Sequence, residues 1–324
     1  MGWKDRLLCS HTELSEEEAE QLQHSVAPGY TVEVRPPVQT SKSASLEQFV
    51  RGIQELQTRW LGVRNTSPVT AFEIRRTGRD IRLQFSVPTK RLERKVRAHL
   101  SNQVPDVGFS SGSSGLPVLE GETVGGGILT TGRLDHYPLR QEFDQPPVNA
   151  LAAALHRHSM QDTKIVVQVL FQPSVGRPLR SWWWTRRAYK RIGYLRKEKE
   201  KLWGSRSPTP REKRQANAIE AKAGNNRFHT VIRFVVIGAG EYTRSRVKEL
   251  SGAFNVYENP ETGQYFDTVT VQSLWEGRIV DFCRSVADRE FDSWALKFQT
   301  GVPELAALVS IPNRQQENIS YAQP

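Results

Sequence analysis

The chain has 324 residues, of which 37% are hydrophobic and 25% charged, and its formal net charge is +10 at pH 7. This length accommodates about two domains. Two cysteines exclude a disulfide framework, no apolar run approaches the roughly 18 residues of a membrane-spanning helix, and the acidic N-terminal segment does not fit a signal peptide. We therefore expect a cytoplasmic protein.

The positive charge is concentrated in one segment of the chain. Residues 174–227 contain 16 lysines and arginines but only 4 aspartates and glutamates, so this segment carries +12 while the rest of the chain carries −2. A nearly neutral body with one basic module indicates a polyanionic partner, which is either nucleic acid or an anionic membrane surface.

The first half of the chain shows the element order β-α-β-β-α-β after an acidic helix that Ser15 caps. Alternating apolar residues indicate the strands, and apolar residues three and four positions apart indicate the helices. The predicted segments are a strand at 30–37, a helix at 43–61, two strands joined by a turn at 77–80, a helix at 90–103 and a short strand at 106–112. In the first of these helices the apolar stripe runs from Leu46 to Trp60. This order is typical of the ferredoxin-like unit.

The same order of elements repeats after residues 113–127, whose glycines and serines predict a linker. The second set comprises a strand at 128–140, a helix at 148–158, strands at 164–172 and 228–238, a helix at 241–254 and strand residues within 255–271. We therefore predict an α+β protein with two tandem ferredoxin-like (βαββαβ) domains. The predicted parts are an N-terminal helical segment (1–29), the first domain (30–112), the linker, the second domain (128–272) with a basic insertion (173–227), and C-terminal helices with a polar tail (273–324).

Residues 183–203 of the basic insertion predict an amphipathic helix. Its apolar stripe consists of Trp184, Ala188, Ile192, Leu195 and Leu202. Its other side carries cations that suit phosphates and rings that suit stacked bases. The candidate nucleic-acid-binding residues are Trp183, Arg186, Arg187, Lys190, Arg191, Tyr194, Lys197 and Lys201. Two alternatives stay open: a solvated charged helix whose tryptophans are buried, and a helix that lies on anionic lipid.

No motif in the sequence supports catalysis or a cofactor. Gly238 and Gly240 follow a strand, but Thr243 replaces the third glycine of a dinucleotide-binding loop, so we expect a tight turn. His156 and His158 lie two positions apart on a predicted helix and point apart, which does not suit a metal-dependent nuclease. Phosphate-binding loops, zinc motifs and nucleophile elbows are also missing from the sequence. We expect no catalytic residue, no metal and no cofactor, and a protein that is not an enzyme.

Three segments together resemble one known family. They are PPVNALAAALHRHSMQDTKIVVQVLFQPSVGRPLRSWW (146–183), RFHTVIRFVVIGAG (227–240) and FQTGVPELAALVSIP (298–312). The segments resemble the non-motor N-terminal region of TraG/HerA-like type IV secretion and conjugation ATPases, in which the signature E-L-A-x-L-x-x-x-P precedes the motor domain. No motor domain follows the signature in this sequence, so the resemblance implies a separately encoded motor ATPase as partner. It also implies a role in assembly for Glu304, Leu305 and Pro312.

We therefore predict a non-catalytic accessory or assembly subunit of a conjugation-like DNA-transfer ATPase. It would bind nucleic acid, DNA rather than RNA, through the basic aromatic helix. The alternative is a structural or scaffold protein of a virus or mobile element, with the basic insertion facing packaged nucleic acid. We also expect an oligomer in the cytoplasm, with an anionic membrane surface as a further partner if the protein is peripheral to the membrane.

Overall fold

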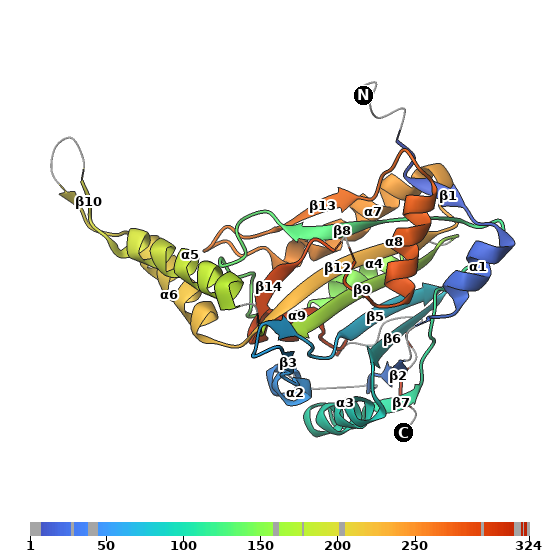
Figure 1. The fold of residues 1–324 in the computed structure, drawn as a ribbon, viewed down its shortest axis with the longest axis horizontal. Helices are drawn as coiled ribbons and strands as arrows, with labels where there is room; N and C mark the ends of the chain where they lie inside the picture. Colours follow the sequence, from blue (N-terminus) through green and yellow to red (C-terminus); the bar gives the residue numbers. More distant parts are fainter. Residues whose placement is uncertain are drawn as a thin grey trace.

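The computed structural model describes residues 8–26, 29–37, 45–157, 162–176, 178–200, 205–292, 295–313, 319 and 321–322. Within these residues one ten-stranded sheet forms the body of the molecule, and helices cover both of its faces (Figure 1). Two further helices extend from one side of the body as an arm.

Most strands of the sheet lie where the alternation of apolar residues predicts them. They are β1 (His11–Glu13), β2 (Tyr30–Arg35), β5 (Thr70–Thr77), β6 (Asp80–Val87), β7 (Gly108–Ser111), β8 (Thr123–Thr131), β9 (Lys164–Pro173), β12 (Arg227–Ile237), β13 (Phe266–Thr270) and β14 (Phe298–Gly301). Their order is β1-β8-β12-β9-β5-β6-β2-β7, with β13 beside β8 and β14 beside β12. Two short ribbons lie outside the sheet: β3 (Thr58–Arg59) with β4 (Arg64–Asn65), and β10 (Lys199–Glu200) with β11 (Ser205–Arg206).

Capping residues and apolar spacing in the sequence also determine where several helices form. The helices are α1 (Glu16–Gln23), α2 (Glu47–Ile53), α3 (Lys90–Gln103), α4 (Val148–Leu155), α5 (Pro178–Arg196), α6 (Pro210–Gly224), α7 (Thr243–Gly252), α8 (Gly277–Ala287) and α9 (Val302–Leu308), with short 3-10 helices η3 (Gly240–Tyr242) and η4 (Ala253–Tyr257) on either side of α7. The cap predicted at Ser15 is confirmed, because its hydroxyl accepts from the amide of Glu18 and the Glu18 carboxylate accepts from the amide of Ser15 at 3.0 Å.

The prediction of two tandem ferredoxin-like domains is wrong. Most of the expected elements exist, but they form one ten-stranded sheet and not two separate small domains. Within each half the neighbouring strands are antiparallel, as in the pairs β2–β6 and β8–β12. In addition, β5 pairs with β9 from Thr70 opposite Phe171 to Arg76 opposite Ile165, which joins the two halves into one sheet. The chain therefore has one body whose cores are shared by both halves.

Two hydrophobic layers cover the sheet, and alternation along the strands supplies both. On β9, Ile165 and Val167 face one layer, whereas Val166 and Leu170 face the other. The first layer includes residues of α2, α3, α4, α7 and α9, and the second includes residues of α1 and α8. In Figure 1, α8 crosses in front of the strands and α1 lies at the right-hand edge of the sheet.

The glycine-rich end of the predicted linker 113–127 is part of the sheet. These glycines lie in β8 and allow close packing on both of its faces. An added Cβ at Gly126 would lie 2.7 Å from the ring of Phe282 in α8, and one at Gly127 would lie 2.4 Å from Val247 in α7. The missing side chains thus let both helices approach the strand, and the segment does not separate two sheets.

The helix predicted at 43–61 is shorter in the structure, and its residues 43 and 44 lie outside the described part of the chain. Helix α2 ends at Ile53, after which the chain forms the β3–β4 ribbon. The Ser67 hydroxyl accepts from the amide of Gln57 at 3.0 Å and donates to its carbonyl at 3.2 Å, which fixes a turn in place of helical hydrogen bonds. Trp60 is consequently 78% exposed instead of buried.

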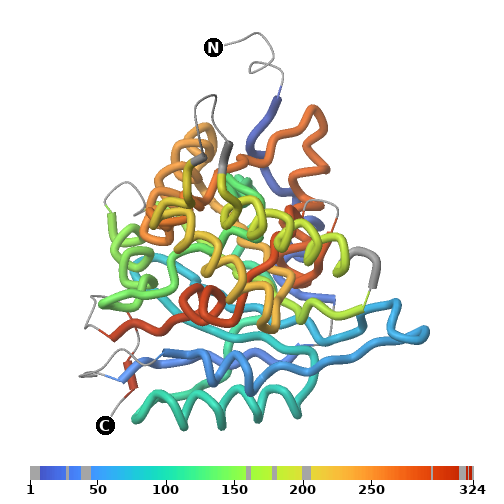
Figure 2. Tube along the Cα trace, turned by 90° about the vertical axis from the view of Figure 1, so that its left-hand side faces the viewer, coloured from blue at the N-terminus to red at the C-terminus, as the bar shows by residue number. Residues whose placement is uncertain are grey.

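The basic insertion 173–227 forms the arm. Helices α5 and α6 pack side by side, with the β10–β11 ribbon at the tip (Figure 1). The apolar contact between the two helices comes from Ala188, Ile192 and Leu195 of α5 and from Ala216 and Ile219 of α6. Figure 2 views the molecule from the side of the arm, and there both helices lie in front of the sheet.

A row of buried polar side chains crosses the sheet beneath α8. Glu73 of β5 lies opposite Gln168 of β9, which lies opposite Arg233 of β12, and all three are at most 2% exposed. Gln168 donates to Glu73 at 2.9 Å and accepts from Arg233 Nε at 3.1 Å, and Arg289 donates to Glu73 at 2.8 Å. Burial by itself raises the pKa of Glu73, but the charges of Arg289 and Arg75 outweigh it and hold this pKa below its usual value. The charges of this row are therefore satisfied within the protein.

A basic cleft between the arm and the sheet

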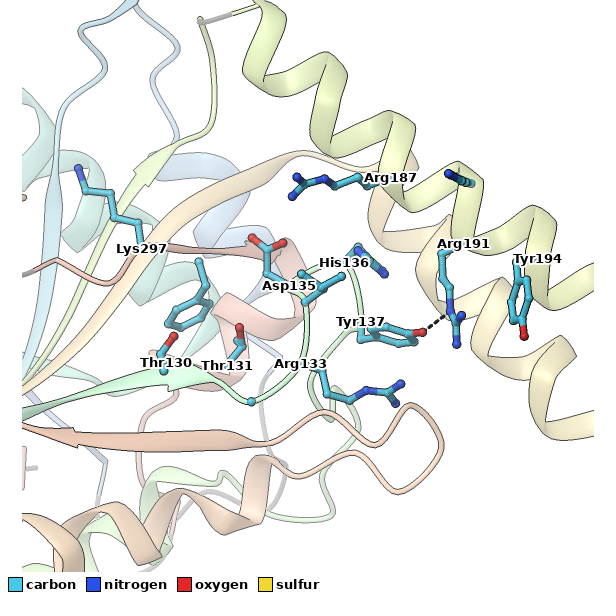
Figure 3. Close-up of a pocket in the computed structure, with 14 residues that line it drawn as sticks. Thr130, Thr131, Arg133, Asp135, His136, Tyr137, Arg187, Arg191, Tyr194 and Lys297 are labelled. Carbon is cyan, nitrogen blue, oxygen red and sulfur yellow. Dashed lines mark hydrogen bonds between the residues drawn. The ribbon is translucent and has the colours of Figure 1, made fainter.

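A cleft of about 1090 Å³ lies between α5 and the sheet (Figure 3). It is bounded by the end of β8, the loop that follows it, one face of α5 and the start of β14. Its charged and aromatic lining residues are Arg133, Asp135, His136, Tyr137, Arg187, Lys190, Arg191, Tyr194, Lys297 and Phe298. Five of these side chains are lysine or arginine and one is a carboxylate, so the lining is strongly basic.

Helical spacing places the contribution of α5 on one side of that helix. Arg187, Lys190, Arg191 and Tyr194 follow the i, i+3, i+4, i+7 pattern of a single helix face. The neighbouring apolar stripe of α5 packs against α6. This packing fixes the rotation of α5 about its axis and leaves the basic face toward the cleft.

The loop at 132–138 forms the opposite wall and is fixed from behind by Gln264. The Gln264 side chain is fully buried and accepts from the amide of Arg133 at 2.9 Å. Its amide nitrogen donates to the carbonyl oxygens of Arg133, Leu134 and Tyr137 at distances of 3.0–3.2 Å. The loop is therefore held by specific hydrogen bonds, and the cleft has a preorganised wall.

The one carboxylate in the cleft is already engaged by the protein. Asp135 accepts from Trp184 Nε1 at 2.7 Å through one oxygen and from the amide of Gln299 at 2.9 Å through the other. Arg187 and Lys190 are exposed, and within the described residues neither has an ion-pair or hydrogen-bond partner. The cleft consequently offers positive charge that the protein itself does not neutralise.

Aromatic rings and guanidinium groups alternate along the cleft. Arg133 lies 4.1 Å from the centre of the buried Tyr137 ring, and Arg191 donates a hydrogen bond to the Tyr137 hydroxyl (Figure 3). Arg191 also lies 4.9 Å from the ring of Tyr194, which is 54% exposed. Tyr137 therefore positions the two arginines, while Tyr194 has a ring that is accessible to a ligand.

His136 is a buried, neutral part of the cleft wall. It is 4% exposed, and its Nε2 atom has no hydrogen-bond partner among the described residues. Burial lowers its pKa to about 4, with Asp135 opposing the shift and the positive charges of Lys222 and Arg191 adding to it. The positive charge of the cleft near neutral pH therefore comes from arginine and lysine, not from histidine.

The structure brings together four of the eight residues that the sequence singles out for nucleic acid, namely those on the cleft face of α5. Trp183 and Arg186 do not line the cleft: Arg186 lies 5.0 Å from the ring of Trp182 and 5.8 Å from that of Trp183. Lys197 is exposed just after α5, and Lys201 lies outside the described residues.

The apolar stripe of α5 is not available to a lipid surface. Ile192 is 4% exposed and packs against α6, and Trp184 is half-buried with Arg227 3.9 Å from its ring centre. Leu202, the last residue of the predicted stripe, lies outside the described residues. Trp182 and Trp183 are 50% and 53% exposed, so the tryptophan run is not buried as a unit either.

The three positions that the resemblance assigns to assembly are buried. Glu304 is 1% exposed, lies 2.9 Å from Lys222 Nζ and accepts from the amide of Leu139 at 2.8 Å. Leu305 and Pro312 are also buried. The ion pair of Glu304 with Lys222 joins α9 to α6, and none of the three residues provides an accessible surface in this structure.

The loop half of the cleft was missed by the sequence analysis. The strand predicted at 128–140 begins earlier and ends at Thr131, and the ring of Tyr265 packs where Gly132 has no side chain. Arg133 and Lys297 are distant from α5 in sequence, and only the sheet brings them to it. The run of charged and aromatic residues directly after a strand was the available signal, since such loops often carry function.

Gly238 and Gly240 lie in a tight turn that leads from β12 into η3, which confirms the predicted turn. The amide of Gly238 donates to the Thr123 carbonyl at 2.8 Å, and the amide of Gly240 donates to the Thr123 hydroxyl at 2.9 Å. His156 follows α4, whereas His158 lies outside the described residues. Among the residues that the structure describes, no group of three or more His, Cys, Asp or Glu side chains is placed to hold a metal ion.

No helix in the described part of the chain has the length and apolarity needed to cross a membrane.

Residues 4–324 match the family described as a domain of unknown function (DUF8128), and the chain therefore belongs to this family. No curated protein matches the sequence. The family description states no activity, ligand or partner.

Proposed function

We propose that this protein is a non-catalytic subunit that binds single-stranded nucleic acid in the cleft between α5 and the loop at 132–138. The observation that carries the proposal is the pair Arg187 and Lys190, which face the cleft without a partner among the described residues. Cations that the protein does not neutralise favour a polyanionic ligand.

The arrangement of rings favours a single strand over a duplex. Tyr194 is accessible and lies beside Arg191, which together provide a face for stacking and a charge for a phosphate. In a single strand the faces of the bases are free to stack on such a ring, and this contact tolerates any sequence. Lys297 and Arg133 lie across the cleft, so the backbone of a bound strand would meet cations from both walls.

We further propose that the protein acts beside a separately encoded motor ATPase in DNA transfer. The resemblance to the non-motor region of TraG/HerA-like ATPases supports this setting. The buried positions on α9 are not the contact surface, so the motor would bind elsewhere on the molecule. Co-purification of the chain with the motor encoded next to it tests this part separately, and a motor that never associates with the chain contradicts it.

The test of strand binding is a salt titration with a fluorescently labelled oligothymidylate. If the strand places four phosphates on the cleft, the slope of log affinity against log salt is about −3, since each phosphate of a single strand contributes about −0.7. The double variant Arg187→Gln/Lys190→Gln should flatten the slope by about 1.4 without unfolding the protein, because both side chains are exposed. Fluorescence anisotropy at several salt concentrations measures both quantities.

The matched control is Arg79→Gln/Lys90→Gln. These two residues are exposed, lie in the β5–β6 turn and at the start of α3, and do not line the cleft. The control removes the same charge and should leave the slope within about 0.3 of the wild-type value. An equal loss of slope in both variants would show non-specific attraction, and an absence of binding at low salt would remove the proposal.

A further inference from the structure

A second exposed surface lies at the tip of the β3–β4 ribbon. Trp60, Leu61 and Val63 are 78%, 106% and 53% exposed. Trp60 and Leu61 have φ angles of 58° and 52°, and Gly62 has 84°. Positive φ angles are costly for residues with side chains, and they occur mainly where a surrounding structure enforces them. Here they form the bend that presents two large apolar side chains side by side at the tip.

The ribbon is fixed to the body at its base. Asn65 Nδ2 donates to the carbonyl of Pro173 at 2.7 Å, and Ser67 closes the turn at Gln57. The chain just before α5 packs against the ribbon, since an added Cβ at Gly176 would lie 3.0 Å from the amide of Asn65. The tip is therefore presented in a defined position beside the base of the arm, as Figure 2 also shows.

Two exposed arginines flank the apolar tip. Arg59 and Arg64 lie directly opposite each other across the ribbon. Like charges in this arrangement are destabilising. Both side chains are exposed, and neither has a partner in the described part of the chain. An anion between or beside them would relieve the repulsion.

We propose that this tip inserts into the interface of a membrane that contains anionic lipid. Tryptophan is enriched at the boundary between headgroups and acyl chains, and arginine binds anionic headgroups. Leu61 and Val63 have no ring on which a base can stack, so the tip suits acyl chains better than nucleic acid. Trp182 and Trp183 near the start of α5 are exposed as well.

Another exposed apolar pair in the molecule lacks the charge that lipid would need. Leu274 and Trp275 are 63% and 74% exposed, but Glu276 follows them and no arginine flanks them directly. A carboxylate at this position would be repelled by anionic headgroups. The pair therefore serves as a control of similar size and exposure.

The test is co-sedimentation of the full-length chain with vesicles of phosphatidylcholine alone or mixed with phosphatidylglycerol. Wild-type protein should bind the mixed vesicles at low salt and bind the neutral ones at least ten-fold more weakly. Trp60→Ser/Leu61→Ser and Arg59→Gln/Arg64→Gln should each weaken binding to mixed vesicles at least ten-fold. Leu274→Ser/Trp275→Ser should bind as the wild type does. Equal melting temperatures show that each variant is folded.

Membrane insertion of the tip does not depend on strand binding in the cleft, so either can be absent while the other is present. The tip variants should retain wild-type affinity for the oligothymidylate. Vesicle binding that survives the tip substitutions, or that is lost in the control instead, overturns the proposal. Loss of oligonucleotide binding in the Trp60→Ser/Leu61→Ser variant also overturns it, because the tip would then belong to the nucleic-acid surface.

Discussion

The polar row beneath α8 and the cleft beside α5 contain the same kinds of side chain. In the row these side chains are buried and hydrogen-bonded, whereas several of those in the cleft are exposed. In the row, Arg233 is fully buried and donates to Gln168 and to Ser285 Oγ at 3.1 Å. Burial lowers the pKa of Arg233 to about 10, against the raising effect of Asp292 and Glu73, so it stays charged at neutral pH. In the cleft, Arg187 is equally charged but exposed, and it has no partner in the described residues.

This contrast separates the charges that stabilise the fold from those that are available to a ligand. Both regions lie at the seam between segments that are distant in sequence. The row supplies each cation with acceptors from neighbouring strands and from α8. The cleft holds its one carboxylate in hydrogen bonds to protein donors and leaves exposed cations unneutralised. The number of charges is therefore less informative than whether the protein satisfies them.

The largest difference between the two regions is expected when the same substitution is made in each of them. Arg233→Met should lower the free energy of unfolding by about 3–5 kcal/mol, because it leaves buried acceptors without their donor. Arg187→Met should change it by no more than about 0.5 kcal/mol, because the side chain is exposed. Urea denaturation followed by circular dichroism measures both values. Similar losses in the two variants would mean that Arg187 is structural as well.

A smaller effect is expected from the accessible ring of the cleft. Tyr194→Ala should weaken binding of the oligothymidylate by about 1–3 kcal/mol and leave the salt slope unchanged, because stacking releases no counterions. Tyr189→Ala is the matched control: Tyr189 also lies on α5 and is 49% exposed, but it does not line the cleft. Anisotropy titrations at one salt concentration distinguish the two. Equal losses would place the stacking surface outside the cleft.

The smallest effect concerns the pH dependence that His136 introduces. Its pKa of about 4 in the folded chain lies below the ordinary value of 6.5, so the unfolded chain binds the proton more readily. The free energy of unfolding should therefore fall as the pH is lowered from 7 through 6.5 toward 4, and His136→Gln should lose part of this fall. Denaturation at pH 7 and pH 5 measures the difference. If the free energy of unfolding falls equally in the His136→Gln variant, His136 is not the group that causes the pH dependence. The affinity for the oligothymidylate should not change between pH 7 and pH 8.

Several elements followed from the sequence because their causes are local. Helix α3 begins and ends at the predicted residues, since Thr89 caps it and apolar residues recur on one face. The β5–β6 hairpin turns at Gly78, where φ is 61°, as the Thr-Gly-Arg-Asp turn indicates. The prediction of a helix through Trp60 was wrong because the cause of the turn there is not local. The apolar spacing of this segment suits a helix, but side-chain hydrogen bonds from Ser67 favour a turn.

The basic face of α5 could be predicted without the structure, because residues three and four positions apart lie on one side of any helix. The order of most strands and helices along the chain could be predicted in the same way. The pairing of β5 with β9, which forms one sheet in place of two domains, became apparent only in the folded structure. Strand direction and pairing depend on contacts between distant residues, which periodicity along the chain does not encode. For the same reason, Arg133 and Lys297 join the cleft only through the folded sheet.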